Sequence, residues 1–301
     1  MMSTNSILII VLLACLRCWC CIPGTFASPL LRDHRRQQSR NTVFEVILPL
    51  GDSITSNGFG YFSYRYYLWR LLVLFSENNN YFDFDFVGTL ENNYNGNPEW
   101  PPVNGQTFDR DHEGHWGWRA DQIINELAGW LDSYETVPTI ALIHLGTNDC
   151  FQGQPASTTL EELEEIAEIL WSYNPDMKLF YAKIIPSTRP VQDCLDAVNS
   201  GIESLQSKYN NSNSNIVLVD MANGFDPVTD TWDGTHPNNH ASEIMAKKWF
   251  DAIMLQQHAN NSISPSMAPT TIAPTPLPTQ SSSQQDNHGC CCRFWRWMFN
   301  Y

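Results

Sequence analysis

Residues 43–60 read VFEVILPLGDSITSNGFG, in which a run of apolar side chains stops at Gly51, Asp52 and Ser53. An apolar run of this length that ends at a glycine predicts a buried strand finishing near residue 50. Ser53 would then lie at the carboxyl edge of a sheet, where α/β proteins bind their ligands. The serine lacks the Gly-x-Ser-x-Gly frame of many esterases. Taken alone, a Gly-Asp-Ser tripeptide is more often a turn in which the serine caps a helix.

Four more strand-like runs follow, and helix-length segments separate them. The five runs cover residues 43–50, 84–88, 139–146, 178–185 and 215–221. The segments that we expect to be helices cover residues 61–76, 119–134, 159–173, 194–209 and 241–257. In TLEELEEIAEILW, residues 159–171, apolar side chains recur every three or four positions, as in an amphipathic helix. The alternation predicts an α/β fold with a five-stranded parallel sheet that helices cover on both faces.

Residues 92–106, NNYNGNPEWPPVNGQ, interrupt this alternation with a long loop of Asn, Gly and Pro. Long loops in compact domains are often functional. We therefore expect this loop to take part in a site.

The charge of the chain restricts its partners. The 301 residues carry a formal net charge of −15, and a basic cluster, RDHRRQQSR at 32–40, lies near the N-terminus outside the expected sheet. An acidic surface repels phosphate backbones, which argues against a nucleic-acid partner and favours a neutral substrate.

A second group of polar residues lies in TWDGTHPNNH, residues 231–240, after the last expected strand. There Asp233 could orient one imidazole nitrogen of His236 while the other nitrogen faces Ser53. The alternative is that these side chains cap the next helix and that the histidine lies on the surface. His240 invites a metal interpretation, which we reject because no third ligand has a suitable spacing.

Two further residues could stabilise a developing oxyanion. Asn148 follows the strand-like run at 139–146 and could direct a side-chain amide over the same edge of the sheet, and Gly117 precedes an expected helix and could offer its N–H. An Asx turn at Asn148 and an ordinary helix start at Gly117 are the alternatives. Asp52 and Asp149 are expected to fix the neighbouring loops by local hydrogen bonds.

Taken together, four blocks resemble the SGNH (GDSL-type) hydrolase superfamily. They are GDSIT at 51–55, GHWGWRADQI at 114–123, HLGTND at 144–149 and DGTHPN at 233–238, and they occur in the order of that superfamily. Within it, LPLGDSIT, DFVGTL, GHWGW and LIHLGTNDC look most like the acetyl xylan esterase-like carbohydrate esterase family 3.

The resemblance implies a role for each matched residue. Ser53 matches the nucleophile, His236 the base and Asp233 the orienting acid, and the oxyanion hole would consist of the N–H groups of Ser53 and Gly117 and the amide of Asn148. It also implies a flavodoxin-like three-layer α/β/α sandwich with no cofactor and no metal. The tryptophans that flank the glycine, Trp116 and Trp118, are candidates for substrate binding because an aromatic face can stack on a sugar.

The ends of the chain have their own signals. The apolar run ILIIVLLACL at 7–16, followed by small residues, predicts a signal peptide at 1–27 and hence a secreted or cell-surface protein. An uncleaved membrane anchor is the alternative. After a basic segment at 28–41, we expect the hydrolase domain at 42–258, a Pro/Ser/Thr-rich linker at 259–289 and a Cys/aromatic tail at 290–301. The tail could contact a membrane, bind a partner or be the remnant of a damaged module. Glycosylation signals at Asn210 and Asn260 agree with export.

Cys150 and Cys194 are the cysteines within the expected domain. In an oxidising compartment we expect them to form a disulfide, with two free buried thiols as the alternative.

These observations lead to a functional expectation with two alternatives. We expect a monomeric secreted esterase that removes acetyl or other short acyl groups from xylan or a related polysaccharide. The first alternative is a hydrolase of lipid or other acyl esters with the same catalytic set. The second is a non-catalytic cell-surface protein that keeps the fold.

Overall fold

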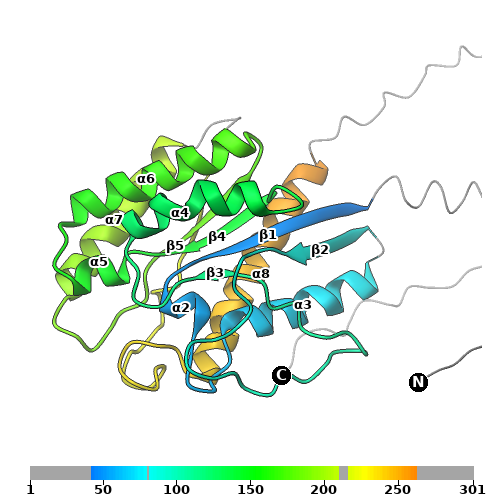
Figure 1. Cartoon of the computed structure of the whole chain (residues 1–301), viewed down its shortest axis with the longest axis horizontal. Coiled ribbons are helices and arrows are strands. Elements are labelled where there is room, and N and C mark those ends of the chain that lie inside the picture. The colour runs from blue at the N-terminus through cyan, green and yellow to red at the C-terminus, as the bar shows by residue number, and fades with distance from the viewer. Residues whose placement is uncertain (1–41, 80, 210–215, 263–301) are drawn as a thin grey trace, which may run out of the picture. The chain divides into compact units, whose positions relative to one another are not determined.

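A parallel sheet of five strands forms the centre of the protein (Figure 1). The computed structural model describes residues 42–79, 81–209 and 216–262, with side chains up to His258. The predicted strands are present in the order β2-β1-β4-β5-β6, and every neighbouring pair is parallel. Their bounds are β1 Val43–Gly51, β2 Phe82–Phe86, β4 Ile140–His144, β5 Lys178–Ala182 and β6 Ile216–Val219.

The sequence did not predict a two-residue strand, β3 (Glu113–Gly114). It pairs in parallel with the end of β1, where Leu50 lies opposite Glu113 and Gly51 opposite Gly114. This pairing brings the chain that follows residue 114 to the carboxyl end of β1.

Helices cover both faces of the sheet, as expected (Figure 1). Helices α3 and α8 pack on one face, and α4, α6 and α7 pack on the other. Two short helices, α2 and α5, directly follow β1 and β4. The helix bounds are α2 Ser53–Ser56, α3 Tyr64–Asn78, α4 Ala120–Ser133, α5 Thr147–Phe151, α6 Ala156–Tyr173, α7 Gln192–Lys208 and α8 Asn239–Ser262.

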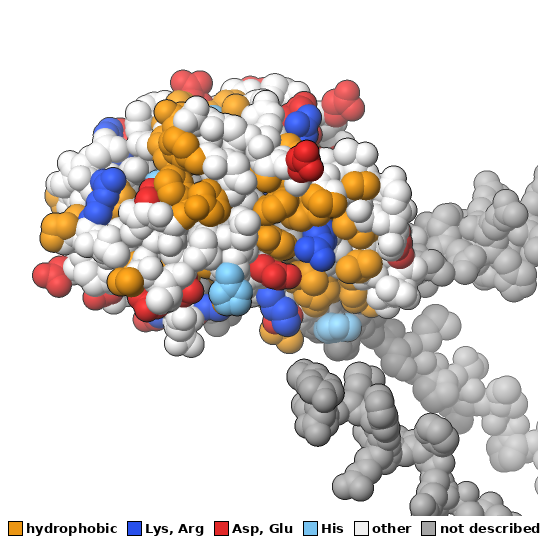
Figure 2. Space-filling view, turned by 90° about the horizontal axis from the view of Figure 1, so that it is seen from below, with side chains coloured by type: hydrophobic (Ala, Val, Ile, Leu, Met, Phe, Trp, Pro, Cys, Tyr) orange, Lys and Arg blue, Asp and Glu red, His pale blue; other side chains and the backbone are white. Residues whose placement is uncertain are grey.

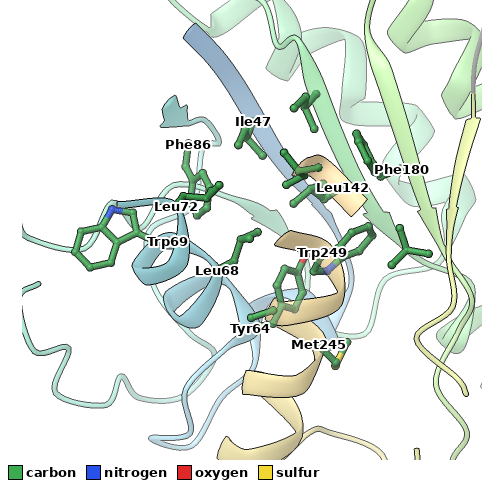
Figure 3. Packing of buried hydrophobic residues seen from close by; sticks show 14 of the residues in the cluster. Ile47, Tyr64, Leu68, Trp69, Leu72, Phe86, Leu142, Phe180, Met245 and Trp249 are labelled. Carbon is green, nitrogen blue, oxygen red and sulfur yellow. The ribbon is translucent and has the colours of Figure 1, made fainter. Parts of the chain in front are cut away.

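Successive residues of β1 point to opposite faces, which divides the core into two clusters. Ile47 packs with side chains of α3 and α8, among them Leu68 and Trp249, as Figure 3 shows. Its neighbour Leu48 packs in the other cluster, with Leu127 of α4. These side chains are fully buried, and each such burial stabilises the fold by about 1.5–3 kcal/mol. Burial on both faces explains why the strands read as continuous apolar runs.

The last residue of β1, Gly51, has to be a glycine because its backbone approaches β4 too closely for a side chain. A Cβ atom at this position would lie 2.3 Å from the carbonyl oxygen of His144. The next residue, Asp52, caps α2 by accepting a hydrogen bond from the N–H of Ile54 at 2.9 Å. Ser53 therefore begins a helix at the carboxyl edge of the sheet.

A disulfide joins Cys150 to Cys194, as expected for an oxidised protein. It connects α5 to α7 across a sequence separation of 44 residues. Closing a loop of this length stabilises the native state by about 4 kcal/mol in the chain-entropy model.

Several expectations concern residues outside the described ranges. These are the signal peptide at 1–27, the basic segment at 28–41, most of the linker at 259–289, the tail at 290–301 and the glycosylation signal at Asn210. Helix α8 continues to Ser262, four residues past the expected end of the domain at 258. Within the described ranges, the helices are too short or too polar to cross a membrane.

Candidate active site

Three connections at the carboxyl edge of the sheet carry the residues expected to act. Ser53 begins α2 after β1, and Asn148 lies in α5 after β4. Asp233 and His236 lie in the loop between β6 and α8. Ser53, Asn148 and His236 are each less than a tenth exposed.

Ser53, His236 and Asp233 form one hydrogen-bonded chain. The Oγ atom of Ser53 lies 2.9 Å from Nε2 of His236, and Nδ1 of His236 lies 2.7 Å from Oδ2 of Asp233. An ionised carboxylate only accepts hydrogen bonds, so Nδ1 carries the proton of a neutral His236. Nε2 is then the acceptor that faces the hydroxyl of Ser53.

A tight turn places Asp233 and His236 in this geometry. Oδ1 of Asp233 accepts hydrogen bonds from the N–H groups of Thr235 at 3.0 Å and of His236 at 2.8 Å. Gly234 has a φ of +87° and donates its N–H to Oγ1 of Thr231 at 2.7 Å. The carboxylate thus closes the turn with one oxygen and orients the imidazole with the other.

The electrostatics favour a neutral imidazole beside an ionised carboxylate. Burial lowers the pKa of His236 and outweighs the opposite effect of Asp233, and the charge of Arg189 lowers it further. Burial alone would raise the pKa of Asp233, but the hydrogen bonds from His236 and Thr235 and the attraction of the carboxylate to a protonated His236 lower it. At neutral pH, His236 can therefore accept a proton.

Asn148 connects the two loops that carry the other expected oxyanion donors. Its Nδ2 donates to the carbonyl of Trp118 at 2.9 Å and makes a longer contact of 3.4 Å with Oδ2 of Asp52. Trp118 follows Gly117, and Asp52 precedes Ser53. The amide therefore lies between the loops of Gly117 and Ser53, while its hydrogens are directed to those neighbours.

Gly117 occupies a backbone conformation that favours glycine, with a φ of +81°. Its turn is tied to β1 because the N–H of His115 donates to the carbonyl of Gly51 at 2.9 Å. Glu113, fully buried, supports the turn from behind, since its carboxylate accepts from Nε2 of His115 at 2.7 Å and from the hydroxyl of Tyr134 at 2.7 Å. The carboxylate also accepts both the N–H and the hydroxyl of Thr89.

The carboxyl groups of Asp52 and Asp149 fix neighbouring loops, as expected. Oδ1 of Asp149 accepts the N–H of Ala120 at 3.1 Å at the start of α4. Burial raises the pKa of Asp52 to about 7 and that of Asp149 to about 6, and the charge of Asp149 adds to the effect on Asp52. Burial thus reduces the negative charge next to the place where an oxyanion would form.

Arg65, which the sequence reading missed, supports the chain behind Ser53. It is fully buried, donates to the carbonyls of Thr55 at 3.0 Å and Ser56 at 3.3 Å, and reaches Oδ1 of Asn93 at 2.8 Å. Burial lowers its pKa to about 9. An arginine on an apolar helix gives no sequence signal for such a contact, because its partners are mostly backbone groups.

The two candidate tryptophans lie in different surroundings. The ring of Trp116 stacks on the imidazole of His236, with a centroid distance of 4.3 Å and an interplanar angle of 17°. The ring of Trp118 stacks instead on His115 at 4.5 Å and lies near Trp130. Trp116 is thus part of the site, whereas Trp118 packs against the residues that support the glycine turn.

A second indole lies beside His236, and the sequence analysis did not predict it as part of the site. Trp232 lies 5.3 Å from the imidazole centroid at an angle of 20°, and its other neighbours are Phe59 and Tyr61. Its position next to Asp233 in the sequence is the signal that could have found it.

A serine, a histidine and an aspartate linked in this way at the edge of an α/β sheet define the arrangement of a serine hydrolase. The sequence profile of the GDSL-like Lipase/Acylhydrolase family matches residues 50–244. The chain therefore belongs to this family and is a GDSL-like esterase or acylhydrolase.

Solved structures similar to this one include three with esterase names. An acetyl esterase mutant with acetate ion is 27% identical, with a TM-score of 0.61 over 72% of this chain and 99% of the other. A carbohydrate esterase family 3 from Talaromyces cellulolyticus is 28% identical, with a TM-score of 0.61 over 71% of this chain and 99% of the other. A Clostridium thermocellum family 3 carbohydrate esterase is 26% identical, with a TM-score of 0.59 over 72% and 99%. A comparison with curated protein sequences gave no match.

Proposed function

We propose that the protein is a secreted carbohydrate esterase that removes acetyl groups by a Ser53–His236–Asp233 acyl-enzyme mechanism. The observation that carries the mechanism is the hydrogen-bonded chain with contacts of 2.9 and 2.7 Å. The acetyl and carbohydrate part is supported by the names of the structures that are 26–28% identical. Secretion is supported by the apolar segment at residues 7–16.

In the first half of the reaction, Nε2 of His236 takes the proton of Ser53 as Oγ attacks the ester carbonyl carbon. The N–H of Ser53 lies at the start of α2, where a helix leaves such groups without an intrahelical acceptor. This N–H, the N–H of Gly117 and the amide of Asn148 donate to the tetrahedral anion. The long contact between Asn148 and Asp52 is the one that the anion would replace.

In the second half, His236 gives its proton to the departing alcohol oxygen, which leaves an acetyl ester on Ser53. A water molecule then attacks this ester while His236 takes a proton from it. Release of acetate returns the proton to Oγ of Ser53. Asp233 stabilises the imidazolium that forms in both halves and keeps the ring in its orientation.

The test is a comparison of purified wild type with Ser53→Ala on p-nitrophenyl acetate, p-nitrophenyl octanoate and acetylated xylan. We expect the wild type to prefer acetate esters and to release acetate from the polysaccharide, and the variant to be inactive on all three. Equal activity of the two proteins on p-nitrophenyl acetate would refute the site. A strong preference for the octanoate would refute the acetyl assignment and favour a lipid or other acyl ester.

Export can be tested separately. Expression of the full chain with a C-terminal epitope should yield protein in the culture medium. N-terminal sequencing by Edman degradation should then show a new N-terminus near residue 28. Retention of the intact N-terminus in the membrane fraction would favour an anchor instead.

A further inference from the structure

Five aromatic side chains form a continuous surface that starts at the imidazole of His236. We call this set the aromatic rim; its members are Phe59, Tyr61, Tyr94, Trp116 and Trp232. Trp116 and Trp232 lie against His236, and Tyr94 stacks on Trp116 with a centroid distance of 4.4 Å. The ring of Phe59 lies 5.3–5.9 Å from those of Trp232, Tyr94 and Trp116.

The outer members of the rim are open to solvent. Phe59 is 47% exposed and Tyr94 is 48% exposed, whereas the two tryptophans are half-buried. Figure 2, seen from the side on which α2 lies in Figure 1, shows hydrophobic side chains gathered on the surface. Contiguous exposed apolar surface beside a reactive group is typical of a binding site.

Phe59 is presented by a strained backbone. Its φ of +53° lies in the left-handed region, which is unfavourable for a bulky side chain, and it lies between Gly58 and Gly60, which would adopt such values more easily. Hydrogen bonds fix the loop in this conformation. The N–H of Phe59 donates to the carbonyl of Tyr94 at 2.9 Å, and the N–H of Tyr94 donates to the carbonyl of Asn57 at 2.9 Å.

A strained conformation that neighbouring hydrogen bonds maintain is common at functional sites. The side chain of Asn57 adds two bonds, to the carbonyls of Phe62 at 2.9 Å and Pro237 at 3.0 Å. Pro237 directly follows His236. The loop that presents Phe59 is therefore tied to the loop that carries the base.

The chemistry of the rim favours a neutral ring with one apolar face and polar edges. The flat faces of the aromatic rings suit stacked C–H groups. The exposed residues Asn92, Asn95 and Asn97 are neighbours of Tyr94 in the sequence of its loop, and Nδ2 of Asn97 donates to Oδ1 of Asn92 at 2.8 Å. The net charge of −15 disfavours a nucleotide base with its phosphates. A pyranose ring has the required combination of an apolar face and hydroxyl edges.

We propose that Phe59 and Tyr94 form a subsite for a pyranose ring on the alcohol side of the scissile ester. The inference rests on the proposed function, because it takes Ser53 and His236 as the reacting groups. Trp116 and Trp232 connect the subsite to His236, so the sugar lies next to the oxygen that His236 protonates.

The experiment compares two variants of the full chain that each remove an exposed phenyl ring. Phe59→Asn suits the left-handed backbone, because asparagine tolerates it. Phe44→Thr is the matched control, since Phe44 is 52% exposed at the opposite end of β1 and threonine suits a strand. For each protein, kcat/KM is measured on p-nitrophenyl acetate and on acetylated xylotetraose.

We expect Phe59→Asn to lower the ratio of the saccharide value to the p-nitrophenyl acetate value by about ten-fold, the size of one ring-stacking contribution. Phe44→Thr should leave both values as in the wild type. The proposal would be overturned if the ratio in Phe59→Asn stayed unchanged, either because both values stay as in the wild type or because both fall equally. The proposal would also be overturned if the wild type hydrolysed p-nitrophenyl octanoate and Phe59→Asn lost that activity, because the rim would then bind an acyl chain.

A binding measurement separates this inference from the proposed function. Calorimetry of Ser53→Ala with unacetylated xylotetraose should detect binding, and adding Phe59→Asn should weaken it about ten-fold. If the wild type cleaves p-nitrophenyl acetate but no acetylated saccharide, the proposed function fails. Binding of xylotetraose that depends on Phe59 would still support the subsite, and binding that does not depend on it would refute the subsite.

Discussion

Replacing Asp233 by asparagine should damage catalysis more than removing the side chain. In asparagine, the amide oxygen is expected to stay where Oδ1 of Asp233 is now, because there it accepts two hydrogen bonds, from the N–H groups of Thr235 at 3.0 Å and His236 at 2.8 Å. In the other orientation the oxygen would accept only one hydrogen bond, from the imidazole. In the first orientation the NH₂ group faces Nδ1 of His236, where Oδ2 now accepts at 2.7 Å. Nδ1 must become the acceptor, so the proton moves to Nε2, and Nε2 can no longer accept from Ser53.

The expected loss for Asp233→Asn is about 10⁴-fold in kcat, the size found when a catalytic histidine is held in the wrong tautomer. Asp233→Ala should lose less, because the carboxylate side chain is 31% exposed and a water molecule can take its place as the acceptor of the Nδ1 proton. Both variants are assayed on p-nitrophenyl acetate, with thermal unfolding as the check that the turn still folds. A kcat for Asp233→Asn above that of Asp233→Ala, or within ten-fold of the wild type, would refute this reasoning.

Three further predictions concern the base, the oxyanion and the disulfide. The pKa of His236 lies below its ordinary 6.5, so kcat/KM should be full at neutral pH and fall as pH drops through that pKa; Arg189→Gln should move this fall to higher pH, and an unmoved pH profile would contradict the assigned charge effect. Asn148→Ala should lower kcat by about 10²–10³-fold with little change in KM, whereas an effect on KM alone would argue against an oxyanion role. Cys194→Ser should lower the free energy of unfolding by about 4 kcal/mol in denaturant titrations, and the difference should vanish when both proteins are reduced; a persistent difference would point to lost packing at Cys150 or Cys194 rather than a lost cross-link.

The sheet and its order of elements could be predicted because the strands are buried on both faces. Their apolar runs, such as residues 140–144, are therefore continuous and leave little choice of assignment. Element ends were less certain. Helix α6 begins at Ala156, after Pro155, three residues before the apolar pattern at residue 159 becomes visible. The two-residue β3 has no pattern of its own and forms only because β1 lies beside it.

Within the site, the sequence indicated the residues that follow strands. Of the aromatic rim it indicated Trp116 and the loop that carries Tyr94, but not the contacts that join the five rings. Ser53 and His236 lie 183 positions apart and meet because β1 and the loop after β6 end at the same edge. Phe59 and Tyr94 meet through a hydrogen bond between two irregular loops, which periodicity cannot predict. The left-handed backbone conformation of Phe59 could not be predicted from the sequence either, because a left-handed residue in this stretch is expected to be one of the neighbouring glycines.

The hydrogen bonds of the Glu113 carboxylate bear on which substitutions would lower the activity of this enzyme. The carboxylate accepts hydrogen bonds from three separate segments, through Thr89, His115 and Tyr134, and so assembles the glycine turn before any ester arrives. A preassembled cradle for negative charge spends no reorganisation energy during the reaction. A substitution at Tyr134 should therefore slow turnover as the loss of a reacting group would, although the reacting groups stay intact. Screens for inactive variants should detect this position even though its contact is with Glu113 and not with the ester.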